Sequence, residues 1–183
     1  YGALRGPYMK KVLYILAELD DDDVQWMSAN GSRNTLSPGE VLITQGVDLE
    51  SLFVTLDGRF SVSVNGAEVA KTGAGEVLGE ISFVDHHPPT ATVTAVEESH
   101  VLAIPREVIH EKLRSDREFA ARFYLALSTF LADRLRGILE QVGGGAGVSD
   151  WSSDTEELDL DRLDAVSRAG DRFQRVLRQL GTN

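Results

Sequence analysis

Cysteine is absent from this 183-residue sequence, which excludes disulfides, thiolate catalysis and cysteine-ligated zinc. No apolar run approaches the roughly 20 residues that a membrane-spanning helix needs, so we expect no membrane partner. Walker-type loops, HExxH and the nucleophile-elbow sequence are also missing, and no other catalytic constellation is visible. These absences predict a protein that is not an enzyme, and a lack of disulfides is compatible with a cytoplasmic location.

Positive charge is also scarce, because 18 lysines and arginines face 29 aspartates and glutamates, for a net charge of −11. Such a surface opposes binding to nucleic-acid phosphates, so we expect no DNA partner. The hydrophobic fraction of 42% supports a buried core. We divide the chain into residues 1–8, which precede a candidate natural start at Met9, helices at 9–32, strands and turns at 33–105, helices at 106–142, a glycine-rich and acidic linker at 143–157, and a terminal helix at 158–183.

Short β-prone runs separated by turn residues fill the segment 33–105. Asn65-Gly66 is a strong hairpin signal between two of these runs. Strands this short at this turn spacing are typical of a β-barrel or jelly roll, so the predicted class is α+β, with helices before and after the barrel. The predicted strands are Val41–Gln45, Leu52–Leu56, Phe60–Val64, Ala67–Thr72, Val77–Leu78, Thr90–Ala95 and Val101–Ile104.

Four consecutive aspartates, Asp20–Asp23, precede an apolar stretch. Carboxylates are favoured at the N-terminus of a helix, so this run predicts the start of a short helix, which should end near Ala29-Asn30-Gly31. Ligation of a metal is the alternative, but side chains adjacent in sequence do not converge on one point. We therefore expect no metal site here.

A long helix is predicted from about Asp116 to Val142. Its apolar residues recur at helical spacing, whereas Arg117, Arg134 and Glu140 are assigned to other faces. The stripe either covers the barrel or contacts another protein, and its length favours a partner helix, in a homodimer or with another protein. The stripe comprises Phe119, Phe123, Leu127, Phe130, Leu131, Ile138 and Val142.

The terminal amphipathic helix carries four arginines at helical spacing. Contact with nucleic acid is one interpretation of this basic stripe, but acidic residues flank it, so we favour the solvated face of a docked helix. The four residues are Arg168, Arg172, Arg175 and Arg178.

The stretch Gly79–Val93 combines a turn, one helical turn, two prolines and a β-branched strand. A glycine before a single helical turn aims free backbone N–H groups at an anion, here around Gly79–Ser82. Glu80 supplies an acceptor for a hydroxyl, as acidic residues do for riboses elsewhere. Pro88 and Pro89 fix the backbone and stop the helix. Together these features predict a phosphate-binding cup with a sugar-binding carboxylate.

This stretch resembles the phosphate-binding cassette of cyclic-nucleotide-binding domains, the family that includes catabolite activator protein and the regulatory subunits of protein kinase A. The family pattern is roughly F-G-E-[LI]-[AS]-L, four variable residues, then P-R-[ATS]-[AS]-[TS]-V. The first half matches Leu78–Phe83, and the second matches Pro88 and Thr90–Val93 with the same spacing. Further similarity lies in Leu36–Gly46 and Leu52–Gly58. The ligand-binding residues that the resemblance implies are Leu78, Gly79, Glu80, Ile81, Ser82, Pro89, Thr90 and Ala91.

The resemblance implies binding of cAMP or cGMP and a non-catalytic regulatory role, in which occupancy moves the helices after Pro105. Pro89, however, stands where the family has the arginine that pairs with the cyclic phosphate. Three outcomes stay open: another cation substitutes (His86, His87 or a residue of the C-terminal helices), the ligand binds weakly, or the module no longer binds nucleotides. Relatives that regulate transcription carry a helix-turn-helix after the long helix, and too little chain remains here for one.

Overall fold

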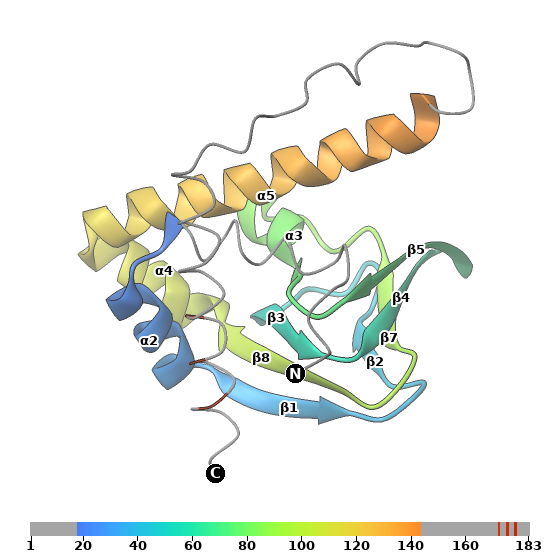
Figure 1. Cartoon of the computed structure of the whole chain (residues 1–183), viewed down its shortest axis with the longest axis horizontal. Coiled ribbons are helices and arrows are strands. Elements are labelled where there is room, and N and C mark those ends of the chain that lie inside the picture. Colours follow the sequence, from blue (N-terminus) through green and yellow to red (C-terminus); the bar gives the residue numbers. More distant parts are fainter. Residues whose placement is uncertain (1–17, 144–171, 173–174, 176–177, 179–183) are drawn as a thin grey trace, which may run out of the picture.

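The computed structural model describes residues 18–143 together with Arg172, Arg175 and Arg178. The helix predicted before Leu19, the linker after Gly143 and most of the predicted terminal helix lie outside the described residues. Within the described part, two four-stranded antiparallel sheets face each other, and long helices cover one end (Figure 1). This arrangement confirms the predicted α+β class and the jelly-roll barrel. No helix in the described part is both long and apolar enough to cross a bilayer.

Each sheet mixes strands from distant parts of the chain, and every pairing is antiparallel. One sheet has the order β1 (Ser32–Leu36), β8 (Ser99–Pro105), β3 (Ser51–Asp57) and β6 (Val77–Leu78). The other has the order β2 (Val41–Ile43), β7 (Thr92–Ala95), β4 (Arg59–Val64) and β5 (Ala67–Gly73). Their inner faces enclose one core, built from Leu36, Ile43, Phe53, Phe60, Leu78, Val93, Ala95, Val101 and Ala103.

Most predicted strands are present with ends shifted by one or two residues. The Asn65-Gly66 hairpin is confirmed, with φ of 51° and 82° at its two residues, as a type I′ turn requires. β2 stops at Ile43, and Gln45 instead bonds to Asn65 through both ends of its side-chain amide. β1 was not predicted, because four of its five residues are exposed and leave no alternating apolar pattern.

Four helices complete the described fold: α2 (Asp21–Asn30), α3 (Glu80–Asp85), α4 (Arg106–Ser115) and α5 (Arg117–Gly143). The predicted role of the aspartate run is confirmed. Asp20 caps α2 and accepts from the backbone N–H of Asp23, while the Asp23 side chain accepts from the backbone N–H of Asp20. Among the described residues, no cluster of three acidic or histidine side chains is placed to hold a metal ion.

A second core lies between the helices and the β1–β8–β3–β6 sheet. Its helical members include Phe119, Phe123, Leu127 and Phe130, all at most 3% exposed. The first half of the α5 stripe is therefore an internal packing face, and its interpretation as a partner contact is wrong for these four residues. The side chains of Ile138 and Val142 are outside the described residues.

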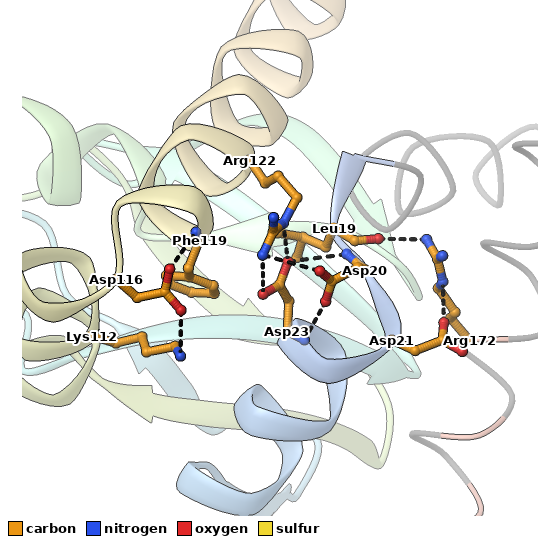
Figure 2. Close-up of polar contacts among 9 residues, drawn as sticks. All are labelled: Leu19, Asp20, Asp21, Asp23, Lys112, Asp116, Phe119, Arg122 and Arg172. Carbon is orange, nitrogen blue, oxygen red and sulfur yellow. Dashed lines mark hydrogen bonds and ion pairs between the residues drawn. The ribbon is translucent and has the colours of Figure 1, made fainter.

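Arginines from two other segments converge on the N-terminus of α2 (Figure 2). Arg122 of α5 bonds to Asp23 at 2.6 and 3.0 Å and to Asp20 at 3.0 Å. Arg172 donates to Asp21 and to the carbonyl oxygen of Leu19, and Arg175 lies 3.0 Å from Asp21. The predicted solvated face is thus wrong for Arg172, whose side chain is only 16% exposed. Arg168 is outside the described residues.

Candidate functional site

The site begins where β6 ends, at Leu78 and Gly79. Leu78 is buried opposite Phe53 of β3, and it anchors the turn to the barrel. Gly79 has φ of 89° and ψ of 5°, a left-handed conformation that L side chains rarely adopt. A Cβ at this position would lie 3.0 Å from the Cδ1 atom of Leu49. The left-handed backbone therefore favours glycine, and any larger residue would also crowd the Leu49 side chain.

α3 is a short helix whose first turn immediately follows Gly79. Its backbone bonds run from Phe83 N–H to Gly79 O at 3.0 Å and from His86 N–H to Ser82 O at 3.1 Å. It ends at Asp85, and the capping residue His86 has φ of 59°. Ser82 is buried, whereas Ile81 is exposed. The turn and single short helix predicted for this stretch are confirmed.

Glu80 is buried and is paired with an arginine of α5. The residue is 2% exposed, and its Oε1 atom is paired with the NH1 atom of Arg134. Burial raises the pKa of Glu80, and the charge of Arg134 and the backbone N–H groups of Glu80 and Gly79 offset only part of this effect. The carboxylate predicted to bind a ribose hydroxyl is therefore held by a cation of the chain itself.

Arg106, the first residue of α4, fixes α3 from another side. Its guanidinium donates to the carbonyl oxygens of Ser82 at 2.8 Å and Leu49 at 3.2 Å, and it lies 5.6 Å from the centre of the Phe83 ring. These bonds tie the cassette helix to the start of α4 and to the segment before β3. Arg106 thus connects α3 and α4 directly.

Aromatic contacts join α3 to both long helices. The buried Phe83 ring stacks on His110 of α4 at 4.7 Å between centroids, and it meets Phe123 of α5 edge-on at 5.7 Å. Burial lowers the pKa of His110, and the nearby charges of Arg106 and His86 lower it further. A neutral ring is thus favoured in this stack. His86 and His87 are both exposed, as expected for a turn.

The second half of the cassette is the connection from α3 to β7. Pro89 is buried, and its carbonyl oxygen accepts from Gly46 N–H at 2.8 Å. Thr90 is exposed and Ala91 is half-buried. The hydroxyl of Thr92 accepts from Gln45 N–H at 3.1 Å. The connection is therefore fixed against the β2–β3 turn, and no positive charge is present at position 89.

Two arginines of the site, Arg106 and Arg134, were missed at the level of sequence. Arg134 was assigned to a face away from the apolar stripe, which is wrong. It follows Phe119, Phe123, Leu127 and Phe130 at intervals of four, four, three and four residues, the spacing of one helical face. A charged residue on the buried face of a helix needs a partner of opposite charge, so the spacing of Arg134 could have indicated its ion pair.

Comparison with known proteins agrees with this geometry. Residues 33–116 match the family model described as the cyclic nucleotide-binding domain. A 120-residue stretch is 32% identical to a cGMP-dependent protein kinase of Eimeria tenella, and the match covers 63% of this chain and 12% of the kinase. The chain thus spans only a small part of that relative.

Solved structures give the same result. A cyclic nucleotide-binding domain from Methylobacillus flagellatus superposes with a TM-score of 0.66 at 19% identity, over 79% of this chain and 86% of that one. The N-terminal domain of a transcriptional regulator from Streptomyces coelicolor has a TM-score of 0.56 at 29% identity, over 79% of this chain and 99% of that one. Residues 33–116 of this protein belong to the cyclic nucleotide-binding domain family.

Proposed function

We propose that this domain binds a cyclic nucleotide, cAMP or cGMP, and relays occupancy through α4 and α5 to a partner, without catalysing a reaction. The observation that carries the proposal is the attachment of α3 to both helices. Ser82 is bonded to Arg106, Phe83 stacks on His110, and Glu80 is paired with Arg134. A ligand that moves α3 therefore alters contacts on α4 and α5 together.

In this proposal, Leu78–Ser82 hold the ribose and phosphate. The backbone N–H groups around Gly79–Ser82 face the anion, although those of Gly79 and Glu80 also interact with the Glu80 carboxylate. Glu80 accepts from the ribose 2′-hydroxyl. Thr90 and Ala91 contact the phosphate or the purine from the second half of the cassette. These roles follow the family pattern, and the left-handed Gly79 and the buried Glu80 support them.

A second candidate function is an interaction module of the same fold that no longer binds nucleotides. Pro89 favours it, because proline has neither a charge nor a backbone N–H. Loss of a single charge-assisted hydrogen bond between an arginine and a phosphate costs roughly 1.5–3 kcal/mol, or about 10- to 100-fold in affinity. The pairing of Glu80 with Arg134 also fits a site that stays closed.

The partner we propose is a second copy of this chain, docked along α5. An exposed seam repeats at intervals of three and four residues on the side of α5 away from the core. Leu125, Leu135 and Leu139 are 52%, 57% and 60% exposed. Two small residues in the seam permit close approach of a second helix, as in a two-stranded coiled coil. The α5 seam comprises Leu125, Ser128, Ala132, Leu135 and Leu139.

Isothermal titration with cAMP and cGMP tests the function, with 5′-AMP and 5′-GMP as controls that lack the cyclic phosphate. We expect a cyclic nucleotide to bind at least tenfold more tightly than its matched 5′-monophosphate. Amide exchange should change in α4 and α5 as well as in α3 when the ligand is added. Absence of binding at millimolar cyclic nucleotide would leave the non-binding module as the function.

A further inference from the structure

We propose that Arg134 of α5 supplies the positive charge for the phosphate of the ligand, in place of an arginine at position 89. This inference rests on the proposed function, because it names the cation of that same site. It differs from the family pattern, in which the cation belongs to the second half of the cassette. Here the charge would come from a helix 54 positions along the chain from Glu80.

The guanidinium of Arg134 is positioned at Glu80. Arg134 extends from the buried face of α5, packs 5.5 Å from the centre of the Phe130 ring, and ends at Glu80. Its side chain is 28% exposed, whereas that of Glu80 is 3% exposed. Arg134 is therefore partly accessible to solvent, and a ligand that contacts Glu80 comes close to the guanidinium that is paired with it.

Arg134 has more hydrogen-bond donors than its contact with Glu80 uses. A guanidinium has five N–H groups in a planar fork, and the contact with Glu80 is made by NH1. The remaining donors can bind a phosphate oxygen while NH1 stays on the carboxylate. Arg134 can thus bridge Glu80 and the ligand, and the sugar-binding carboxylate need not lose its counter-charge.

The other cations near α3 are less suitable. The guanidinium of Arg106 donates to the backbone carbonyls of Leu49 and Ser82, and these bonds fix α3 in place. His86 and His87 are exposed, and the His87 ring lies 3.6 Å from the carboxylate of Asp85. Histidine is also only partly charged near neutral pH. Among these four side chains, Arg134 is the one that contacts the sugar-binding carboxylate.

If the phosphate is held by a residue of α5, ligand affinity depends on how α5 is docked, and the bound ligand in turn holds α5 against α3. Binding of the cyclic nucleotide and docking of α5 are then coupled through the side chain of Arg134.

The test compares each cyclic nucleotide with its nucleoside, which lacks the phosphate, by isothermal titration. The proteins are the native chain, Arg134→Gln, Arg134→Lys and the double variant Glu80→Gln/Arg134→Gln, which leaves no buried carboxylate unpaired. Arg136→Gln, an exposed position two residues further along α5, is the matched control. We expect Arg134→Gln to lose about 10- to 100-fold in affinity for the cyclic nucleotide and little for the nucleoside. The double variant should weaken both ligands, because it also removes the ribose contact of Glu80, and it should lose the preference for the cyclic nucleotide over the nucleoside. Arg134→Lys should keep part of the preference for the cyclic nucleotide over the nucleoside, and Arg136→Gln should keep all of this preference.

Equal losses for cyclic nucleotide and nucleoside in Arg134→Gln would overturn the inference, because Arg134 would then act only by positioning Glu80. An unchanged preference in the double variant would overturn it as well. Both results would leave the proposed function intact, since the native chain would still bind. Failure of the native chain to bind any of these ligands would overturn the proposed function and the inference together.

Discussion

Asp23 and Arg122 are 99 positions apart in the sequence and are joined by two hydrogen bonds, of 2.6 and 3.0 Å (Figure 2). Asp23 also completes the cap of α2, so one buried carboxylate both begins that helix and attaches it to α5. Burial alone would raise the pKa of Asp23, but the guanidinium of Arg122 and the backbone N–H of Asp20 outweigh burial and lower it below 3.8.

Replacement of Asp23 by Asn should destabilise the chain in a pH-dependent way. Because the pKa of Asp23 is lowered by folding, its stabilisation is complete above about pH 3.8 and is lost as the pH falls through the lower folded value. We expect Asp23→Asn to reduce the free energy of unfolding by about 2–3 kcal/mol at pH 7, less than for a fully buried pair because Arg122 is partly exposed. Urea unfolding at pH 7 and pH 2.5 measures this. The control Asp22→Asn, at an exposed neighbouring position, should have little effect at either pH. If Asp23→Asn lowered the free energy of unfolding as much at pH 2.5 as at pH 7, the stabilising role assigned to the ionised Asp23 would be contradicted.

Gly79→Ala should disturb the cassette more than the same change at another left-handed glycine. Gly39 has φ of 86° with nothing within 4 Å of a built Cβ, whereas the Cβ at Gly79 would lie 3.0 Å from Leu49. Both variants carry the left-handed strain of about 1–2 kcal/mol, and only Gly79→Ala adds crowding. Thermal unfolding should therefore show a larger loss for Gly79→Ala, with weaker binding of cyclic nucleotide. Equal losses would mean that the contact with Leu49 relaxes freely.

Pro89→Arg should strengthen the binding of cyclic nucleotide, because it returns a guanidinium to the position where the family carries one. Pro89 uses only its carbonyl oxygen, bonded to Gly46, and an arginine retains that carbonyl. We expect a gain of about 10- to 100-fold in affinity by isothermal titration. Pro88→Arg adds the same charge at an exposed neighbouring position and should increase the affinity only slightly. Equal effects of the two variants would show that general charge, and not the position, is responsible.

Leu139→Asp should dissociate the proposed dimer. A charge in the α5 seam would be buried against the second helix, whereas Val69→Asp introduces the same charge at an equally exposed position on β5. Sedimentation velocity should therefore show monomers for Leu139→Asp and dimers for Val69→Asp and the native chain. A native chain that stays monomeric at high micromolar concentration would rule out the seam as a self-association surface.

Local signals predicted the features that depend on neighbouring residues. The aspartate run predicted a helix start, Asn65-Gly66 predicted a hairpin, and the cassette sequence predicted a turn and a short helix. Each depends on backbone groups only a few residues away, so the pattern carries the information. β1 escaped prediction because its stability comes from pairing with β8 and not from its own apolar content.

Partners distant in sequence could not be predicted in the same way. The acidic run gave no indication that Arg122 and Arg172 would meet it, because any of the chain's arginines satisfies the same charge rule. Arg134 is the instructive exception, since its place on the apolar face was readable from its spacing. Its partner Glu80 was identified as functional, but the sequence did not indicate that a residue of its own chain already holds it.

Arg172 and Arg175 reach the body of the molecule at the first turn of α2, through Asp21 and the carbonyl oxygen of Leu19. Asp21 is exposed, so high salt should weaken these two ion pairs well before it weakens the buried pair at Asp23. Rising ionic strength should therefore weaken the attachment of Arg172 and Arg175 to α2 gradually, while the jelly roll and its cassette stay folded.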